Sequence, residues 1–233
     1  MVLNLETKKV RRITDGSTWY STSGGFDYAW SPDSKWFTLE FIGNKHDPYS
    51  DIGLVSAQGN GEIINLTNSG YSSGSPSFAL DGNAILFTTE RYGMRAHASW
   101  GSLDDAMLVF LNQDAYDKFS LSKEDYELYK EANSDRKKVA AKDSSKVKDV
   151  VVELKNIEDR IVRLTPNSSN MGSTLISKDG KALYYLASTE SGRNLWKMDL
   201  NKKETKLLHK VDAGWTSLEM DKEGKTLFIL NGK

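Results

Sequence analysis

Short stretches in which apolar and polar residues alternate recur along the chain, joined in pairs by turn-forming residues. The clearest pair occupies residues 26–41, where Ser31-Pro32-Asp33-Ser34 separates the two stretches. Proline presets the φ angle of the second turn position, and Asp and Ser stabilise turns through their side chains. After the turn, Phe37, Leu39 and Phe41 occupy alternate positions, a period of two. The segment therefore predicts a strand, a tight turn and a second strand.

Two further predicted strands complete this unit. The third is Asp51–Val55, and the fourth is Glu62–Thr67. The glycine-containing stretch 57–61 lies between them and is typical of a turn. Short connections of this kind favour antiparallel neighbours. We therefore expect a four-stranded antiparallel sheet over residues 26–67.

The same unit recurs along the chain. The strand–turn–strand pattern returns at residues 75–87, 173–186 and 216–230, and a third strand returns at 194–200. The fourth-strand ending recurs as Ile13-Thr14, Leu66-Thr67, Leu164-Thr165 and Leu207-Leu208. The turn acids Asp33 and Asp81 are 48 residues apart, and Asp179 and Glu223 are 44 apart. A repeat of roughly 40–50 residues with four strands is the signature of a β-propeller blade.

These repeats predict an all-β fold, a β-propeller of four-stranded antiparallel blades that occupies residues 1–233. The chain starts at the third strand of one blade and stops after the second strand of another, with three full blades between the two half blades. The half blades add up to one blade, so a four-bladed ring closed at the termini is conceivable. We favour the interpretation that the chain is a piece of a larger propeller.

An insertion at residues 112–156 interrupts the repeat, because Asp81 and Asp179 are 98 residues apart. Asn112 and Ser122 are potential N-caps of two short helices. The polar stretch 134–148 favours a solvated, flexible loop, either a tolerated surface excursion or an arm that docks a partner. Residues 150–154 are expected to form a return strand, and residues 157–165 to close the blade.

Charge and composition narrow the classes of function. The chain has 31 basic and 32 acidic residues and a net charge of -1, which argues against a nucleic-acid binder or a surface for anionic lipid. The absence of cysteine rules out disulfides and thiolate metal sites. No apolar run approaches the roughly 18 residues of a membrane span, and the N-terminus lacks the pattern of a signal peptide.

Two sets of residues resemble known propellers. The run Trp30-Ser31-Pro32-Asp33, followed by an aromatic strand and a Leu-Thr ending, resembles the TolB-type, WD-like propeller repeats. Arg91-Tyr92-Gly93, the helical insertion with Tyr116 and Phe119, the basic linker and the stretch 157–165 are similar to the N-terminal propeller region of tricorn-type serine peptidases.

The second resemblance implies a role in a larger protein. In that family the propellers precede a PDZ domain and a catalytic domain that carries the catalytic Ser, His and Glu, and no segment here matches those parts. It implies a non-catalytic region that admits or holds peptide substrates, contacts other domains of its protein or forms homo-oligomers. The resemblance implies no cofactor for this region. A periplasmic or cell-envelope location would fit, and a cytoplasmic one stays open.

The candidate binding residues lie in two loops. Arg91, Tyr92 and Arg95 follow a second strand, with Trp100 shortly after, and arginine and aromatic residues commonly anchor interfaces. The alternative is that the aromatic residues pack between blades and the arginines are solvated. His46 lies in the loop before Asp51, and we expect Asp51 to orient that loop.

Three hypotheses follow. The first is the tricorn-like propeller region, the second a free-standing TolB-like scaffold for protein contacts in the cell envelope, and the third an enzyme with its site at the propeller's central mouth. Gly70–Gly74 matches G-x-S-x-G, but a strand pattern and not a helix follows it, so we expect an inter-blade loop. The three histidines are too dispersed for a metal site. The sequence thus offers no catalytic residue and no metal ligand.

Overall fold

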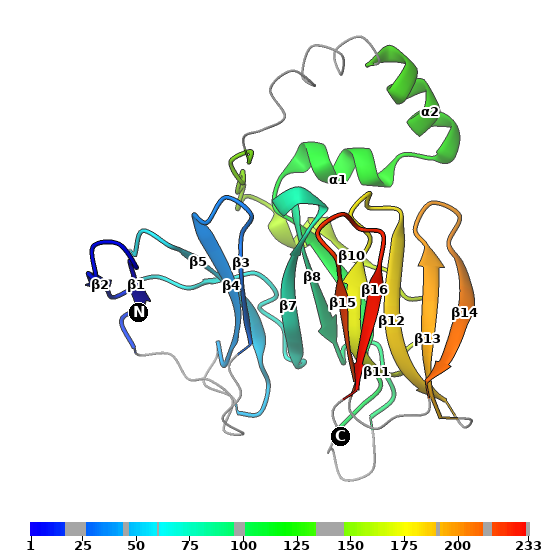
Figure 1. The fold of residues 1–233 in the computed structure, drawn as a ribbon, viewed down its shortest axis with the longest axis horizontal. Coiled ribbons are helices and arrows are strands. Elements are labelled where there is room, and N and C mark those ends of the chain that lie inside the picture. The colour runs from blue at the N-terminus through cyan, green and yellow to red at the C-terminus, as the bar shows by residue number, and fades with distance from the viewer. Residues whose placement is uncertain are drawn as a thin grey trace.

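The computed structural model describes residues 1–16, 27–43, 47–59, 61–95, 101–133, 147–189, 192–211 and 216–231. Among them, five antiparallel sheets follow one another along the chain (Figure 1). The first is the N-terminal pair, β1 (Val2–Leu3) and β2 (Val10–Arg11). The last is the C-terminal pair, β15 (Thr216–Met220) and β16 (Leu227–Asn231).

Three four-stranded sheets lie between these pairs. Blade 1 consists of β3 (Tyr28–Trp30), β4 (Trp36–Phe41), β5 (Asp51–Ser56) and β6 (Ile64–Asn65). Blade 2 consists of β7 (Ser73–Ala79), β8 (Ala84–Thr89), β9 (Asp105–Phe110) and β10 (Ile161–Arg163). Blade 3 consists of β11 (Asn170–Ile176), β12 (Ala182–Thr189), β13 (Gly192–Asp199) and β14 (Glu204–Val211). The predicted propeller of three full blades and two half blades is confirmed.

Each gap between successive sheets is filled by its own apolar cluster. One cluster joins Ile52 and Leu54 of blade 1 to Ile85 and Phe87 of blade 2, and another joins blade 2 to blade 3. Smaller clusters attach the N-terminal pair to blade 1 and the C-terminal pair to blade 3. The stability of each blade therefore depends on its neighbours, as in other repeat architectures.

The strand β9 shows why a central blade is hard to recognise in the sequence. Ala106, Leu108 and Phe110 pack toward blade 3, whereas Met107 and Val109 pack toward blade 1. With both faces buried, the strand carries no polar alternation after Asp105, and sequence periodicity did not identify it.

In each blade a hairpin turn joins the first strand to the second, and the turns of neighbouring blades pack against each other. Their fourth positions have left-handed backbone, with φ of +85° at Gly82 and +70° at Gly180. A methyl group at Gly82 would lie 2.6 Å from Val150 of the insertion and 3.3 Å from Pro32 of the preceding turn, and one at Gly180 would lie 2.7 Å from Leu80. Glycine thus serves both the turn and the close approach of neighbouring blades.

The helical insertion lies between β9 and β10. The helices α1 (Gln113–Ser120) and α2 (Lys123–Ala132) begin at the predicted caps, since the Asn112 and Ser122 side chains accept hydrogen bonds from backbone amides. In Figure 1 both helices stand above the turn end of the blades, which we define as the end carrying the first-to-second strand turns. Phe110 contacts Tyr116 and Phe119 of α1, with ring centroids 5.7 and 5.0 Å apart.

The predicted return strand at residues 150–154 is wrong. This segment belongs to no strand and makes separate hydrogen bonds instead of a ladder: the Val150 amide donates to Asp33 (2.8 Å), and the Glu153 amide donates to the Leu111 carbonyl (2.8 Å). The side chains of Val150 and Val152 pack against the cluster between blades 1 and 2. The apolar pattern of this segment therefore reflects the burial of these valines and not strand pairing.

Two other expectations are corrected. Leu207-Leu208 does not end the fourth strand of blade 3, because β14 continues to Val211. The recurrence of Trp30, Trp36, Phe78, Tyr184 and Trp196 along the sequence predicts that these rings pack between blades, but Trp30 is 42% exposed, although its ring contacts Phe37. Of the stretch 134–148, which is expected to be flexible, residues 134–146 lie outside the described residues. No helix among the described residues is long and apolar enough to cross a membrane.

Candidate binding site

The end of the blades opposite the insertion, here called the loop end, is organised by buried aspartates. Asp51 begins β5 and accepts hydrogen bonds from the Thr67 hydroxyl (2.7 Å), the Asn65 amide (2.9 Å) and the Ser69 backbone amide (3.0 Å). Thr67 belongs to the recurring Leu-Thr ending, so that ending ties the fourth strand to the third. Asp51 therefore orients the segment that follows β6, and the expectation that it orients the loop before β5 stays a prediction.

Asp105 plays the same part in blade 2 and also binds an arginine. It is fully buried and accepts from the hydroxyls of Thr165 and Ser168, both at 2.7 Å. Arg163 donates to Oδ1 of the same carboxylate through Nε (3.0 Å), and its Nη2 lies 2.9 Å from that oxygen as an ion pair and donates to the Ser168 hydroxyl (3.3 Å). Charge-assisted contacts through two nitrogens limit rotation of the guanidinium group. Asp105 therefore positions Arg163 at the loop end.

The loop after β8 brings a tyrosine against that arginine. Tyr92 is 49% exposed, and its ring centroid lies 5.0 Å from the guanidinium carbon of Arg163 and 5.7 Å from that of Arg91. Both distances are within the range of cation–π attraction. This gives a first stack of Arg163, Tyr92 and Arg91.

A second stack forms around Arg95. Its guanidinium carbon lies 5.6 Å from the ring centroids of both Tyr49 and Tyr71. It also donates to the Tyr49 hydroxyl (3.3 Å) and the Glu90 carboxylate (3.2 Å), and these contacts raise the pKa of Arg95 above its usual range. We call the two stacks together the Arg–Tyr cluster (Tyr49, Tyr71, Arg91, Tyr92, Arg95 and Arg163).

Carboxylates lie beneath the cluster. Glu90 accepts hydrogen bonds from the Ser72 backbone amide and the Ser102 hydroxyl, both at 3.2 Å. Burial raises the pKa of Asp104 to about 6, and the nearby charges of Glu90 and Asp105 add to the effect. A carboxyl group with a raised pKa destabilises the fold when it is ionised at neutral pH.

Replacement of Asp104 by asparagine is therefore expected to stabilise the protein at neutral pH. Because its folded-state pKa is raised, Asp104 contributes stability below its unfolded pKa of about 4, and this is lost as the pH rises through about 6. Allowing for partial solvent screening, Asp104→Asn should raise the free energy of unfolding by roughly 1–2 kcal/mol at about pH 7.5 and by almost nothing at about pH 3.5. Urea unfolding at both pH values measures the difference, with the exposed Glu131→Gln as control. An equal gain at both pH values would contradict the assignment.

The structure brings together three of the five predicted binding residues. Arg91, Tyr92 and Arg95 lie in the Arg–Tyr cluster, whereas Trp100 and His46 lie outside the described residues. Sequence reasoning did not identify Arg163, Tyr49 and Tyr71. The one signal for Arg163 was its place beside the Leu-Thr ending, two residues before the threonine that binds the buried aspartate.

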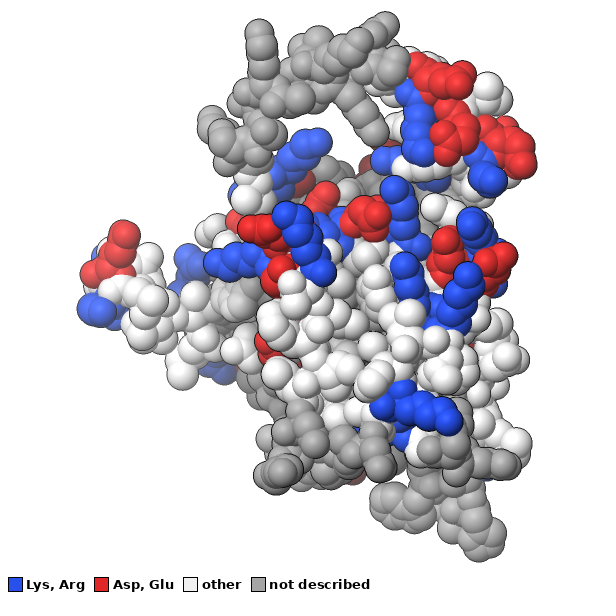
Figure 2. Space-filling view, turned by 45° about the vertical axis from the view of Figure 1, so that its right-hand side comes forward, with Lys and Arg blue, Asp and Glu red and all other residues white. Residues whose placement is uncertain are grey.

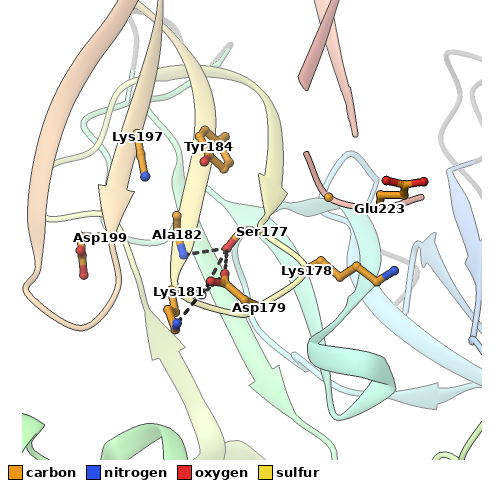
Figure 3. A pocket seen from close by; sticks show the side chains of 10 residues that line it. Ser177, Lys178, Asp179, Lys181, Ala182, Tyr184, Lys197, Asp199 and Glu223 are labelled. Carbon is orange, nitrogen blue, oxygen red and sulfur yellow. Dashed lines mark hydrogen bonds and ion pairs between the residues drawn. The ribbon is translucent and has the colours of Figure 1, made fainter. Parts of the chain in front are cut away.

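The turn end carries a shallow hollow of about 600 Å³ between the hairpin turns of blade 3 and the C-terminal pair (Figure 3). Lys178, Lys181 and Lys197 and the acids Asp179, Asp199 and Glu223 line it. Asp179 and Asp199 accept hydrogen bonds from residues of their own turns. Hydrogen bonds from Ser177 lower the pKa of Asp179, and the Lys202 backbone amide lowers that of Asp199. Carboxylates stabilised as anions are poor proton donors and acceptors at neutral pH, so this hollow is not a convincing catalytic site.

No reactive constellation emerges elsewhere among the described residues. No group of three or more His, Cys, Asp or Glu there could hold a metal ion. The G-x-S-x-G match at Gly70–Gly74 begins in the connection between blades 1 and 2, and its last two residues are already in β7, so a strand and not a helix follows, as expected. A nucleophile elbow requires a helix after the serine.

The comparisons with known proteins give structural neighbours only. No family model and no curated protein matches the chain. Tricorn protease matches with a TM-score of 0.54 and 11% identity, over 88% of this chain and 20% of that chain. TolB from Acinetobacter baumannii matches with a TM-score of 0.51 and 16% identity, over 87% of this chain and 36% of that chain. A puromycin-hydrolyzing peptidase of Mycobacterium tuberculosis matches with a TM-score of 0.51 and 13% identity, over 89% of this chain and 28% of that chain.

The fold is that of a TolB-like or tricorn-type propeller region. At these identities the likeness concerns the fold alone, because one fold hosts many functions. The chain spans about a fifth to just over a third of the length of the three neighbours. In this propeller region, the Arg–Tyr cluster is the candidate site for contact with a partner.

Proposed function

We propose that this chain is the non-catalytic propeller region of a tricorn-like serine peptidase and that its Arg–Tyr cluster holds polypeptide substrate. The supporting observation is the exposed pair of stacks at the loop end, in which Tyr92 and Tyr71 remain 49% and 38% exposed. Tyrosine and arginine supply much of the binding energy of protein interfaces. A tyrosine held against arginine has little conformational freedom left to lose on binding.

The chemistry of the cluster suits extended polypeptide. Tyrosine rings offer flat apolar surface, and guanidinium groups donate to backbone carbonyls and carboxylates. Arg95 and Arg163 keep 38% and 34% of their side-chain surface exposed while a carboxylate anchors each of them. The proposal also includes contact with other domains of the same protein and self-association, in the periplasm or cell envelope, without nucleic acid or membrane insertion.

The binding of an unfolded polypeptide tests this proposal. Fluorescein-labelled β-casein should bind the protein, and the double variant Tyr92→Ala/Arg95→Ala should bind it at least about tenfold more weakly, as expected for two central interface residues. The matched control is Tyr129→Ala/Lys118→Ala, which removes an exposed tyrosine–cation pair from the insertion. Equal loss of binding in the two double variants would contradict a role for the cluster.

A free-standing TolB-like scaffold is the second candidate, supported by the likeness to TolB over 87% of the chain. The complete coding sequence separates the two proposals. A PDZ-like segment and a serine-containing catalytic segment downstream of Lys233 would support the peptidase. A stop codon shortly after Lys233 would favour the scaffold.

A further inference from the structure

The outermost strand of blade 3 is unusually long and open. The strand β14 has eight residues, whereas the outermost strands of blades 1 and 2, β6 and β10, have two and three. Among the described residues β14 pairs only with β13, and most of its side chains are exposed. It forms the right-hand margin of the molecule in Figure 1. A free edge presents unpaired backbone N–H and C=O groups to any extended chain.

The neighbouring blades leave this edge uncovered. They pack against the faces of blade 3, as the apolar clusters on either side of it show. The edge of the outermost strand points away from both faces, so the packing of blades does not close it.

The side chains of β14 give the edge a chemical preference. Lys206, His209 and Lys210 lie on the strand, against a single acid, Glu204. Leu207 and Leu208 are 43% and 48% exposed, which is unusual for leucine in a strand. Figure 2, with this side turned forward, shows charged groups over the upper part of the surface, an uncharged area below them and a further basic group under that area. The edge thus combines basic groups with exposed apolar surface.

We propose that the β14 edge binds an acidic, extended polypeptide segment as an added strand. Strand addition derives affinity from backbone hydrogen bonds and selectivity from side chains on alternate positions. A second copy of this chain is a poor occupant, because pairing β14 with β14 brings basic side chains of the two copies together, and like charges across strands are destabilising. The lysines therefore discourage self-pairing and favour an acidic partner.

A labelled synthetic peptide of alternating Glu and Val tests the site on the whole chain. It should bind more tightly than the Lys-Val peptide of equal length. A Glu-Val peptide with methylated backbone nitrogens keeps its charge but cannot donate backbone hydrogen bonds, so it should bind at least about tenfold more weakly. Equal binding of the methylated and unmethylated peptides would overturn the proposal, because charge alone would then explain the affinity.

Variants and hydrogen exchange locate the bound peptide. The charge reversal Lys206→Glu/Lys210→Glu should weaken Glu-Val binding at least about tenfold and favour the Lys-Val peptide. The control Lys123→Glu/Lys155→Glu changes the net charge equally on exposed residues of the insertion. Backbone amides of β14 should gain protection when the Glu-Val peptide is added. Protection elsewhere without protection of β14 would overturn the proposal.

This inference goes beyond the proposed function and does not depend on it. The Arg–Tyr cluster is built mainly on blade 2 and its adjoining loops, whereas the edge is on blade 3. The Tyr92→Ala/Arg95→Ala variant reports on the cluster whichever polypeptide is added, and the Lys206→Glu/Lys210→Glu variant reports on the edge. Failure of one is therefore distinguishable from failure of the other.

Discussion

Replacing Asp105 with alanine should lower the free energy of unfolding by about 2–4 kcal/mol, because it removes the buried acceptor of several hydrogen bonds and the counter-charge of a partly exposed arginine. The Asp105 side chain is fully buried and accepts from Arg163, Thr165 and Ser168. Its loss leaves the arginine without its counter-charge and two hydroxyls without an acceptor. Urea unfolding followed by tryptophan fluorescence measures the change.

The equivalent aspartate in blade 1 is the matched control. Asp51 is as deeply buried and accepts a comparable set of hydrogen bonds, but no arginine is among its donors. Asp51→Ala should therefore cost less, about 1–3 kcal/mol. If both variants lost the same stability, the ion pair with Arg163 would contribute nothing beyond the hydrogen bonds.

Replacing Arg160 with alanine should have an effect of similar size. The guanidinium group is buried and donates to the backbone carbonyls of Phe110 (3.2 Å), Lys155 (2.9 Å) and Glu153. Without it, carbonyls at the base of the insertion lose their donor and a cavity forms, which together should cost about 3–4 kcal/mol. The midpoint of urea unfolding reports the loss.

Two further variants test the reason for that effect. Arg160→Lys keeps the charge, but a lysine ammonium cannot reproduce the planar fork of donors, so it should recover less than half of the loss. Lys155→Ala removes an exposed side chain next to the same carbonyl and should change stability by less than about 0.5 kcal/mol. Full recovery with lysine would show that charge and not the fork of hydrogen bonds matters.

The Arg160 variants test how the insertion is joined to the propeller, and other contacts contribute to the same junction. The Asn112 side-chain amide donates to Asn83 of the propeller (3.0 Å), and the Gln113 backbone amide donates to the Glu153 carboxylate (2.9 Å), which joins the two ends of the insertion to each other. The return segment reaches blade 1, where Asp149 and Lys35 form an ion pair of 2.6 Å. The described ends of the insertion therefore contribute to the contact between blades 1 and 2.

The sequence by itself determined the repeat and most of its strands. Hairpin turns such as Ser31–Ser34 are set by local chemistry: the Ser31 hydroxyl donates to Asp33 (2.5 Å) and accepts from the Trp36 amide (2.9 Å). Helix caps at Asn112 and Ser122 are local in the same way. Interactions between residues a few positions apart leave a pattern that can be read along the chain.

The sequence was misleading where burial replaced alternation. The strand β9 has apolar residues on both faces, and so it lacked the pattern that marks a half-buried strand. Residues 150–154 have an apolar pattern but form no strand, because Val150 and Val152 pack against the apolar cluster between blades 1 and 2. Apolar character reports burial, and only the neighbouring sheets decide whether a buried segment also pairs.

The candidate site was predictable only as far as it is local. Arg91, Tyr92 and Arg95 are close together in one loop and could be singled out as a group. Their partners Tyr49, Tyr71 and Arg163 come from other loops, and the stacks exist because the Asp51 and Asp105 carboxylates hold those loops at the same end of neighbouring blades. Sequence spacing therefore determined the blades and their turns, whereas blade packing alone decided which distant side chains meet, since contacts between distant loops leave no period in the sequence.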